Sequence, residues 1–278
     1  MNDNEIRALV SLLDDDDTEI VQHVEKQIRT LGGQIIPYLE DHWEENSFNP
    51  LMQKKIENLI HDLQYNSVIE RLQEWRDNGC VDLLEGMWII ATYQYPDLNL
   101  EKLKQYIQDM YFDVWLESRE DIHPHDQVRV INQIFFEKYK FSPNTKNFHS
   151  AANSMINQVF DLKRGNPISL CVIYMLVAQK LGMPVYGVNL PSIFVLVYKS
   201  PQLQFYINVF NKGLIFTKND IDNYIKQLNL EKIETFYEPC NNIDIIRRVL
   251  RNLVVSFEKT GDYDRMQEVD TILRSVLE

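Results

Sequence analysis

The chain has 278 residues, of which 45% are hydrophobic and 25% charged, as is typical of a soluble globular protein. Its length suffices for two or three structural units. The net charge of -13 argues against nucleic acid and anionic membranes as partners, because phosphate groups are bound by clustered Lys and Arg. The sequence shows neither a membrane-spanning apolar run nor a secretory signal at its start, so we expect a cytoplasmic protein.

The cysteines are three in number: Cys80, Cys171 and Cys240. Their odd count, their wide spacing and the lack of a C-x-x-C motif predict neither a disulfide framework nor a structural zinc site. A reducing compartment fits this pattern, and we expect no cofactor.

Residues 1–66 are expected to form amphipathic helices. The run Asp14 to Asp17 interrupts the apolar spacing, and Gly32 ends the second helix. The aspartates lack the mid-loop Gly and distal Glu of a calcium loop, so we interpret them as an acidic turn. The order L-x-x-L-L-D-D-x-D, V-x-x-x-I-x-x-L-G, I-I-P-Y-L resembles a HEAT-type repeat. Helices are expected at residues 4–13, 20–31, from 35 onward, and at 51–63.

The next segment is also expected to be helical, with helices at residues 68–75, 83–93, 100–116 and 126–139. Three tryptophans at apolar positions, Trp75, Trp88 and Trp115, are expected in the core. His123 and His125 flank Pro124 without a third ligand nearby, which is too little for a zinc site, and Pro124 is expected to open the following helix.

Residues 141–157 are polar and predicted to be irregular. A loop of this length within a compact domain is often functional. His149 is therefore a candidate functional residue, because it lies shortly before the most apolar helix. The alternative is a loop histidine whose ring nitrogens are satisfied by the backbone.

The stretch from Arg164 to Phe210 organises the chain. Asn166 is a favoured N-cap and Pro167 suits the first helical position. Nearly every residue from 168 to 181 is apolar, which predicts a helix buried on all sides. Strands are expected at residues 185–189, 193–198 and 204–209. The second is continuously apolar and hence predicted to be central, and a turn at 199–201 predicts that it forms a hairpin with the third.

The C-terminal segment is predicted to contain helices at residues 220–228, 243–260 and 265–277. The sequence L-R-N-L-V-V-S-F-E-K-T-G-D-Y-D-R-M-Q-E-V resembles a tetratricopeptide-type helix pair. One pair is too few for a peptide groove, because such solenoids need about three repeats. We interpret it as a cap.

The motif R-G-N-P-I-S-L, followed by V-A-Q-K-L-G-M-P-V-Y-G-V-N-L-P and Y-I-N-V-F-N-K-G, resembles the bacterial transglutaminase-like family of transglutaminase-core type 2. The resemblance is tight over about residues 164–213. It implies an α+β, helix-rich fold with a papain/transglutaminase-like core, a buried helix plus an antiparallel sheet, flanked by helical repeats. The expected division is 1–66, a HEAT-like unit; 67–235, the core with its preceding helices; and 236–278, the tetratricopeptide-like pair.

Enzymes related to this family use a Cys-His-Asp triad. Aligned by motif, the Cys position falls on Pro167, the His position on Ile193 and the Asp position on Asn208. Proline offers no nucleophile, isoleucine accepts no proton, and asparagine cannot stabilise an imidazolium by charge. The resemblance therefore implies a fold whose acyl-transfer chemistry is lost.

The alternative interpretation is that the protein is an enzyme. Cys171 lies four residues after Pro167 on the same helix face, so a cysteine-dependent amide or peptide hydrolase, or an acyl transferase, could pair it with His149. Against this, apolar neighbours predict a buried thiol with a raised pKa.

The sequence thus predicts a catalytically inactive scaffold that binds a protein or peptide, with no nucleic acid, membrane or metal as ligand. A purely structural subunit of a larger assembly is a third possibility, and it would expose a sizeable apolar patch on the helical units.

Overall fold

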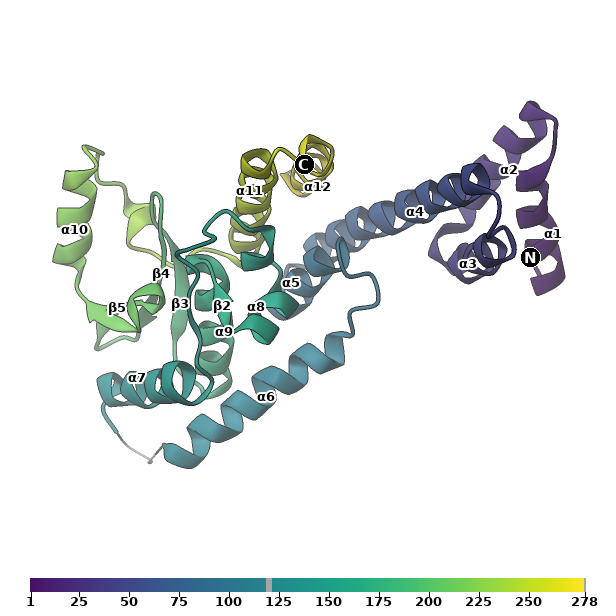
Figure 1. Cartoon of the computed structure of the whole chain (residues 1–278). Coiled ribbons are helices and arrows are strands. Elements are labelled where there is room, and N and C mark those ends of the chain that lie inside the picture. The colour runs from purple at the N-terminus through teal and green to yellow at the C-terminus, as the bar shows by residue number, and fades with distance from the viewer. Residues whose placement is uncertain (119–121, 278) are drawn as a thin grey trace. The chain divides into compact units, whose positions relative to one another are not determined.

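The computed structural model of the protein describes residues 1–118 and 122–277 (Figure 1). The chain forms two compact units, Met1–Gln73 and Glu74–Glu278, hereafter the N-terminal and C-terminal units. The division falls within helix α4 (Pro50–Asp77), as does the predicted boundary between residues 66 and 67. The predicted boundaries themselves remain predictions.

The N-terminal unit is helical. Its other elements are α1 (Asp3–Ser11), η1 (Leu12–Asp14), α2 (Thr18–Leu31), η2 (Gly32–Ile35) and α3 (Ile36–Glu45). The four aspartates form a structural turn: Asp17 accepts a hydrogen bond from the Glu19 amide at 2.8 Å and caps α2, while Asp14 lies 3.1 Å from the Nε2 of His42. The apolar faces enclose one core that includes Leu13, Ile28, Leu39 and Ile56. Whether these helices form a HEAT-type repeat remains a prediction.

The prediction of separate helices at 51–63 and 68–75 is wrong, because α4 runs through the intervening residues. That segment, residues 64–67, contains neither Gly nor Pro, the residues that most often end helices.

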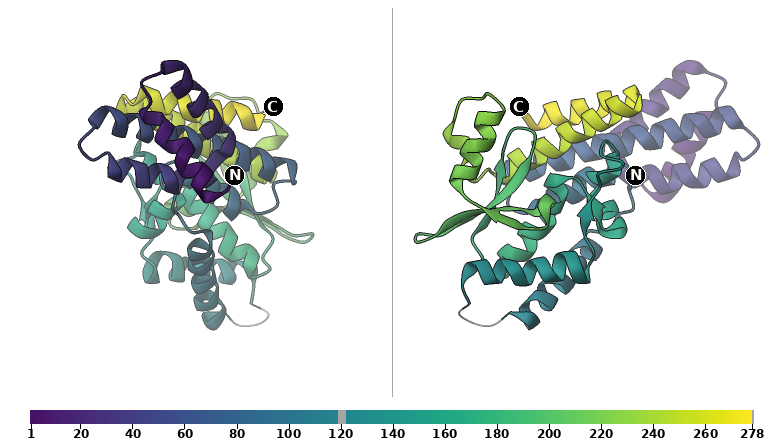
Figure 2. Two further views of the ribbon diagram at one scale, coloured as in Figure 1. Left: turned by 90° about the vertical axis from the view of Figure 1, so that its right-hand side faces the viewer. Right: turned by 60° about the vertical axis from the view of Figure 1, so that its left-hand side comes forward.

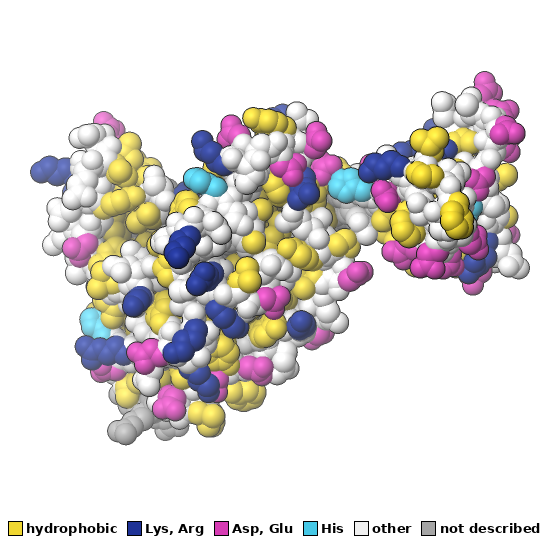
Figure 3. All heavy atoms as spheres, viewed as in Figure 1, with side chains coloured by type: hydrophobic (Ala, Val, Ile, Leu, Met, Phe, Trp, Pro, Cys, Tyr) yellow, Lys and Arg dark blue, Asp and Glu magenta, His cyan; other side chains and the backbone are white. Residues whose placement is uncertain are grey.

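The N-terminal unit is also strongly acidic. Residues 1–73 contain 15 acidic and 6 basic residues, a net charge of -9 against -13 for the whole chain. Figure 3 shows acidic side chains gathered on the face of this unit in view.

The C-terminal unit contains the remaining elements. The helices are α5 (Leu83–Thr92), α6 (Leu100–Glu117), α7 (Pro124–Asn132), the π-helical turn η3 (Gln133–Lys138), η4 (Ala151–Asn153), α8 (Ile156–Leu162), α9 (Pro167–Lys180), η5 (Val209–Asn211), α10 (Lys218–Gln227), η6 (Glu234–Phe236), α11 (Asn242–Thr260) and α12 (Tyr263–Leu277). Pro124 opens α7 as predicted.

Two predictions for this unit are wrong. Helix α8 begins within the segment that was predicted to be irregular as far as Asn157. Trp75 is buried, with 4% of its surface exposed, but Trp115 is 57% exposed, so it is not a core residue. It follows Val114, which is buried, and a helix turns 100° between such neighbours, so a tryptophan one position off the apolar face points outward.

The sheet has four antiparallel strands in the order β3 (Val185–Asn189), β4 (Phe194–Lys199), β5 (Gln204–Asn208) and β6 (Leu214–Phe216). Strand β4 is internal and forms a hairpin with β5, as predicted. Strand β6 was not predicted, because three residues are too few for a recognisable alternation. Two further short strands, β1 (Ser142–Pro143) and β2 (Arg164–Gly165), pair in parallel.

Helices cover both faces of the sheet. Val195 and Val197 of β4 join a buried cluster with Ile221 and Ile225 of α10. The alternate residues of β4 face the other way, where α9 packs against β3 and β4 (Figure 1). Strand β4 is therefore buried on both faces, which explains its unbroken apolar run.

A polar contact fixes α9 against the turn that follows β5. The hydroxyl of Tyr174 on α9 donates to the Oδ1 of Asn132 at 3.0 Å, and the Nδ2 of Asn132 donates to the carbonyl of Gly213 at 3.1 Å. Gly213 has a φ of 69°, and an added Cβ would lie 1.9 Å from Asn132 Oδ1. Only glycine fits this position.

Helices α11 and α12 lie side by side as an antiparallel pair (Figure 2). Gly261, with a φ of 77°, ends α11 in the left-handed conformation typical of such turns. The assignment to the tetratricopeptide type remains a prediction. Among the described residues, no helix is both long and apolar enough to cross a membrane.

Candidate active site at the start of α9

The first turn of α9 is held by a capping box. Asn166 Oδ1 accepts from the Ser169 amide at 3.0 Å, and Ser169 Oγ accepts from the Asn166 amide at 3.1 Å. The Nδ2 of Asn166 donates to the hydroxyl of Ser154 at 2.8 Å. Pro167 then occupies the first helical position, as predicted. The helix start is therefore rigidly placed, but the residue there has no reactive side chain.

A cleft of about 130 Å³ lies at this helix start. The lining comes from the loop before α8, from the start of α9, from the turn before β4 and its first residue, and from α11. Its residues are Phe148, His149, Asn166, Pro167, Ile168, Ser192, Phe194, Arg248, Asn252, Val255 and Ser256. The structure thus brings His149 and Pro167 to one cleft. The contribution of α11 was missed, because a predicted cap helix far along the chain gives no local sign of facing this site.

Arg248 is the cationic group of the cleft lining. Its Nη1 donates to the Oδ1 of Asn189 at 2.9 Å, at the end of β3. Burial foremost, and then the like charge of Arg251, lowers the pKa of Arg248. A half-buried guanidinium of this kind has hydrogen-bonding capacity left for an anionic or carbonyl group of a ligand.

The predicted His position, Ile193, lies at the edge of the apolar cluster between the sheet and α10. Ser192 has a φ of 62°, in the left-handed region that a glycine would occupy without strain. The side chain of Ile193, which follows, packs against the apolar cluster between the sheet and α10. At this position the structure therefore has a packing residue.

The predicted Asp position also holds a residue with a structural contact. Asn208 Oδ1 accepts from the Asn211 amide at 3.0 Å and caps the turn η5 after β5. Among the described residues, the side chain of Asn208 forms no other hydrogen bond.

Cys171 lies in the core. Its side chain is 0% exposed, and its Sγ donates to the carbonyl of Phe194 at 3.5 Å. Burial raises the pKa of this thiol far above its usual range. His149, in contrast, is exposed and stands edge-on to Phe148, with 5.4 Å between the ring centroids. Within the described chain, no hydrogen bond joins Cys171 to an imidazole.

The histidines near α7 form a local turn. His123 Nδ1 accepts from the His125 amide at 3.2 Å, and the two rings meet edge to face at 4.8 Å. In the described ranges, 1–118 and 122–277, no group of three or more His, Cys, Asp or Glu side chains is placed to hold a metal ion.

A buried helix that starts beside a cleft and packs on an antiparallel sheet defines the transglutaminase-like class of folds. The sequence profile of the Transglutaminase-like superfamily matches residues 101–251, which is more than half of the chain. The protein therefore belongs to this superfamily. The match contains α9, the whole sheet and the candidate triad positions.

Similar proteins occur in bacteria and in animals. A UPF0162 protein of Xylella fastidiosa (strain 9a5c) is 28% identical over 208 residues, which cover 72% of this chain and 74% of that protein. The UPF0162 protein YchA of Escherichia coli (strain K12) is 25% identical over 135 residues, 47% of this chain and 50% of that protein. F-box only protein 21 of Mus musculus is 29% identical over 139 residues, 47% of this chain and 22% of that protein. No solved structure matches the chain.

Proposed function

We propose that this protein is a transglutaminase-like scaffold that binds a protein or peptide and performs no acyl transfer. The observation that carries the proposal is the side-chain chemistry at the motif-aligned triad positions. Pro167 starts α9 at the cleft, Ile193 packs on the sheet cluster and Asn208 caps a turn. None of the three can act as nucleophile, proton acceptor or charged orienting group.

The environment of Cys171 supports the same proposal. A catalytic thiolate needs access to substrate and a neighbouring base or cation that lowers its pKa. This sulfur is buried, its pKa is raised by burial, and its hydrogen bond goes to a main-chain carbonyl. These features speak against the alternative of a hydrolase or transferase that pairs Cys171 with His149.

The cleft at the start of α9 is our candidate binding site. Its lining combines apolar surface from Phe148 and Val255 with polar groups from His149, Arg248 and Asn252. Such a mixture suits a peptide side chain and its adjoining main chain. The mouse relative also supports a modular role, because the matched segment covers 22% of that longer protein.

Activity is tested by incubating the protein with glutamine-containing peptides and amine donors beside a Cys171→Ala variant. We expect no turnover by either protein above the rate without protein. Turnover that disappears in Cys171→Ala would overturn the proposal in favour of the cysteine enzyme.

Binding is tested by cross-linking in native lysate, followed by mass spectrometry. Val255 is 43% exposed on α11 and lines the cleft, so Val255→Trp fills it. Val81→Trp is the matched control, because Val81 is 82% exposed and is not a lining residue of the cleft. We expect a protein that the wild type and Val81→Trp retain and Val255→Trp loses. Equal retention by all three would exclude the cleft as the binding site.

A further inference from the structure

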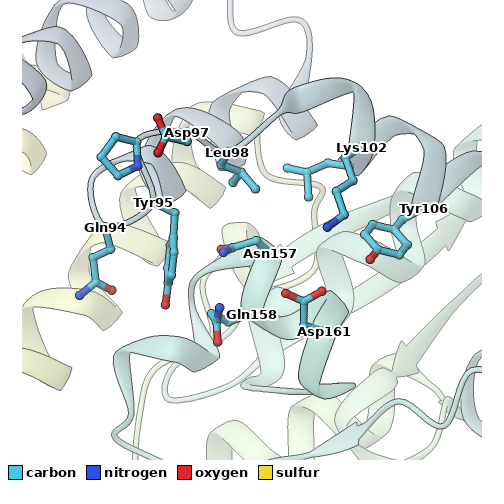
Figure 4. Close-up of a pocket in the computed structure, with 11 residues that line it drawn as sticks. Gln94, Tyr95, Asp97, Leu98, Lys102, Tyr106, Asn157, Gln158 and Asp161 are labelled. Atoms are coloured by element: carbon cyan, nitrogen blue, oxygen red, sulfur yellow. The ribbon is translucent and has the colours of Figure 1, made fainter. Parts of the chain in front are cut away.

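A second and larger cavity lies in the C-terminal unit, between the loop after α5 and helices α6 and α8 (Figure 4). Its volume is about 490 Å³, within the range of roughly 300–1,000 Å³ typical of small-molecule sites. Its lining residues are Gln94, Tyr95, Pro96, Asp97, Leu98, Lys102, Leu103, Tyr106, Asn157, Gln158 and Asp161. Neither the triad positions nor the cleft residues belong to this set.

Two helices present paired side chains to this cavity. Lys102 and Tyr106 lie one turn apart on α6, and Asn157 and Asp161 lie one turn apart on α8. Side chains spaced by four residues share a helix face, so each helix directs a pair to the same space. The site is therefore built from regular elements on two of its sides.

Asn157 is a buried polar residue of the cavity whose side-chain oxygen has no hydrogen-bond donor among the described residues. It is 8% exposed, and its Oδ1 is buried without a hydrogen bond. In Figure 4 the amide points into the space between Tyr95 and Leu98. Because an unpaired buried polar atom costs about 1–3 kcal/mol, a ligand N–H that reaches this amide would remove a penalty of the free protein.

The charged groups of the cavity also lack a direct ion pair within the described chain, although Asp161 acts electrostatically on Lys163: burial lowers the pKa of Lys163, and the Asp161 carboxylate counteracts that shift. Lys102, Asp97 and Asp161 form no ion pair or hydrogen bond with any described side chain, although most other charged residues of α6 do. Figure 4 shows the Lys102 ammonium and the Asp161 carboxylate on opposite sides of one end of the cavity, and Asp97 towards the other end. A complementary ligand has one anionic and two cationic groups.

Aromatic groups complete the lining. Tyr106 stacks on Phe160 with 5.0 Å between centroids, and the Nζ of Lys163 lies 5.4 Å from its ring. Its two contacts hold this ring in place, so the cavity wall is fixed before a ligand arrives. Tyr95, at the other end, offers a ring for contact with a cationic side chain.

We propose that this cavity binds a basic α-amino acid, arginine or lysine. The carboxylate of the ligand pairs with Lys102, its α-ammonium with Asp161, and its side-chain cation with Asp97 beside the ring of Tyr95. The Asn157 amide accepts an N–H of the ligand. This combination satisfies each unpaired polar group described above with one small molecule.

The test is calorimetric titration of the full chain with L-arginine and L-lysine. Agmatine, which lacks the carboxylate, and L-citrulline, which lacks the side-chain charge, are the comparison ligands. We expect saturable binding of at least one basic amino acid and binding of both comparison ligands that is weaker by roughly tenfold or more, since each lacks a charged hydrogen-bonded pair.

Lys102→Gln and Asp161→Asn are each expected to weaken binding by about tenfold or more. Lys259→Gln and Asp264→Asn are matched controls on the exposed surface of α11 and α12, and they should bind as the wild type does. All four sites are exposed, so circular dichroism should show an unchanged fold. The proposal is overturned if neither basic amino acid binds, if agmatine binds as tightly as arginine, or if both cavity variants bind normally.

Discussion

At the scale of single residues, Cys171 separates the two functional hypotheses most clearly. Its position one turn after Pro167 places it on the helix that carries the nucleophile in related enzymes. A sequence alone gives no direct measure of whether such a thiol reaches solvent. The structure buries it against the main chain of β4, where the thiolate would lack water, a base and a cation.

We expect Cys171 to resist alkylation in the folded protein, because burial shields the sulfur and raises the pKa of the thiol. Iodoacetamide at pH 8, followed by peptide mass spectrometry, should label Cys171 only after denaturant is added. Cys80, which is half-buried, is the internal control and should react earlier. Labelling of Cys171 at the rate of Cys80 would show that the thiol is accessible.

Gly213 gives a second prediction at this scale. Gly213→Ala should lower the free energy of unfolding by at least about 2 kcal/mol, because it combines a left-handed backbone with a clash against Asn132. Gly182→Ala is the matched control: its φ is 77°, but no atom lies within 4 Å of an added Cβ. It should lose only about 1 kcal/mol from backbone strain. Chemical denaturation measures both, and equal losses would show that the Asn132 contact is unimportant.

At the scale of elements, local signals predicted much of the fold. Asn166 and Pro167 start α9 as capping preferences require, and the apolar run of β4 correctly indicated an internal strand. What local signals missed depends on distant parts of the chain. Helix α8 is short and polar on one side, and it is stabilised by packing on α5 and α9.

The candidate site was likewise predictable only in part from the sequence. The positions of Pro167, Ile193 and Asn208 were available from motif spacing, but their actual contacts were not. Arg248 belongs to a helix more than 50 residues after the sheet begins, so its place in the same cleft lining as His149 required the tertiary fold. Unpaired groups such as Asn157 are visible only once every neighbouring side chain is placed.

The capping box of α9 gives a prediction for an element. Asn166→Ala should cost about 1–2 kcal/mol of stability, because it removes the side-chain acceptor of the Ser169 amide and leaves the buried Ser154 hydroxyl without this partner. Asn241→Ala is the matched control, since Asn241 is also an N-cap but makes no side-chain capping bond. Urea denaturation should show a smaller loss for Asn241→Ala. Equal losses would mean that the capping bonds of Asn166 contribute little.

At the scale of the whole molecule, the two units differ in net charge and have separate apolar cores. The N-terminal unit carries -9 of the net charge of -13 and encloses its own apolar core. The C-terminal unit holds the family match, the cleft and the larger cavity. The proposed binding functions therefore both belong to the C-terminal unit, and the acidic surface of the N-terminal unit would favour a basic partner.

Separate cores predict separate responses to core substitutions. Leu39 is fully buried in the N-terminal unit and Leu170 is fully buried on α9, so each Leu→Ala substitution should cost about 2–5 kcal/mol. Hydrogen exchange followed by mass spectrometry locates the loss. We expect Leu39→Ala to remove amide protection mainly from α1, α2 and α3, and Leu170→Ala to remove it mainly from α9 and the sheet. The void left by a truncated side chain first weakens the cooperative unit that contains it. If either substitution lowered protection equally along the whole chain, the two units would unfold as one, and a ligand bound at the cavity would then stabilise the N-terminal helices as strongly as α6 and α8.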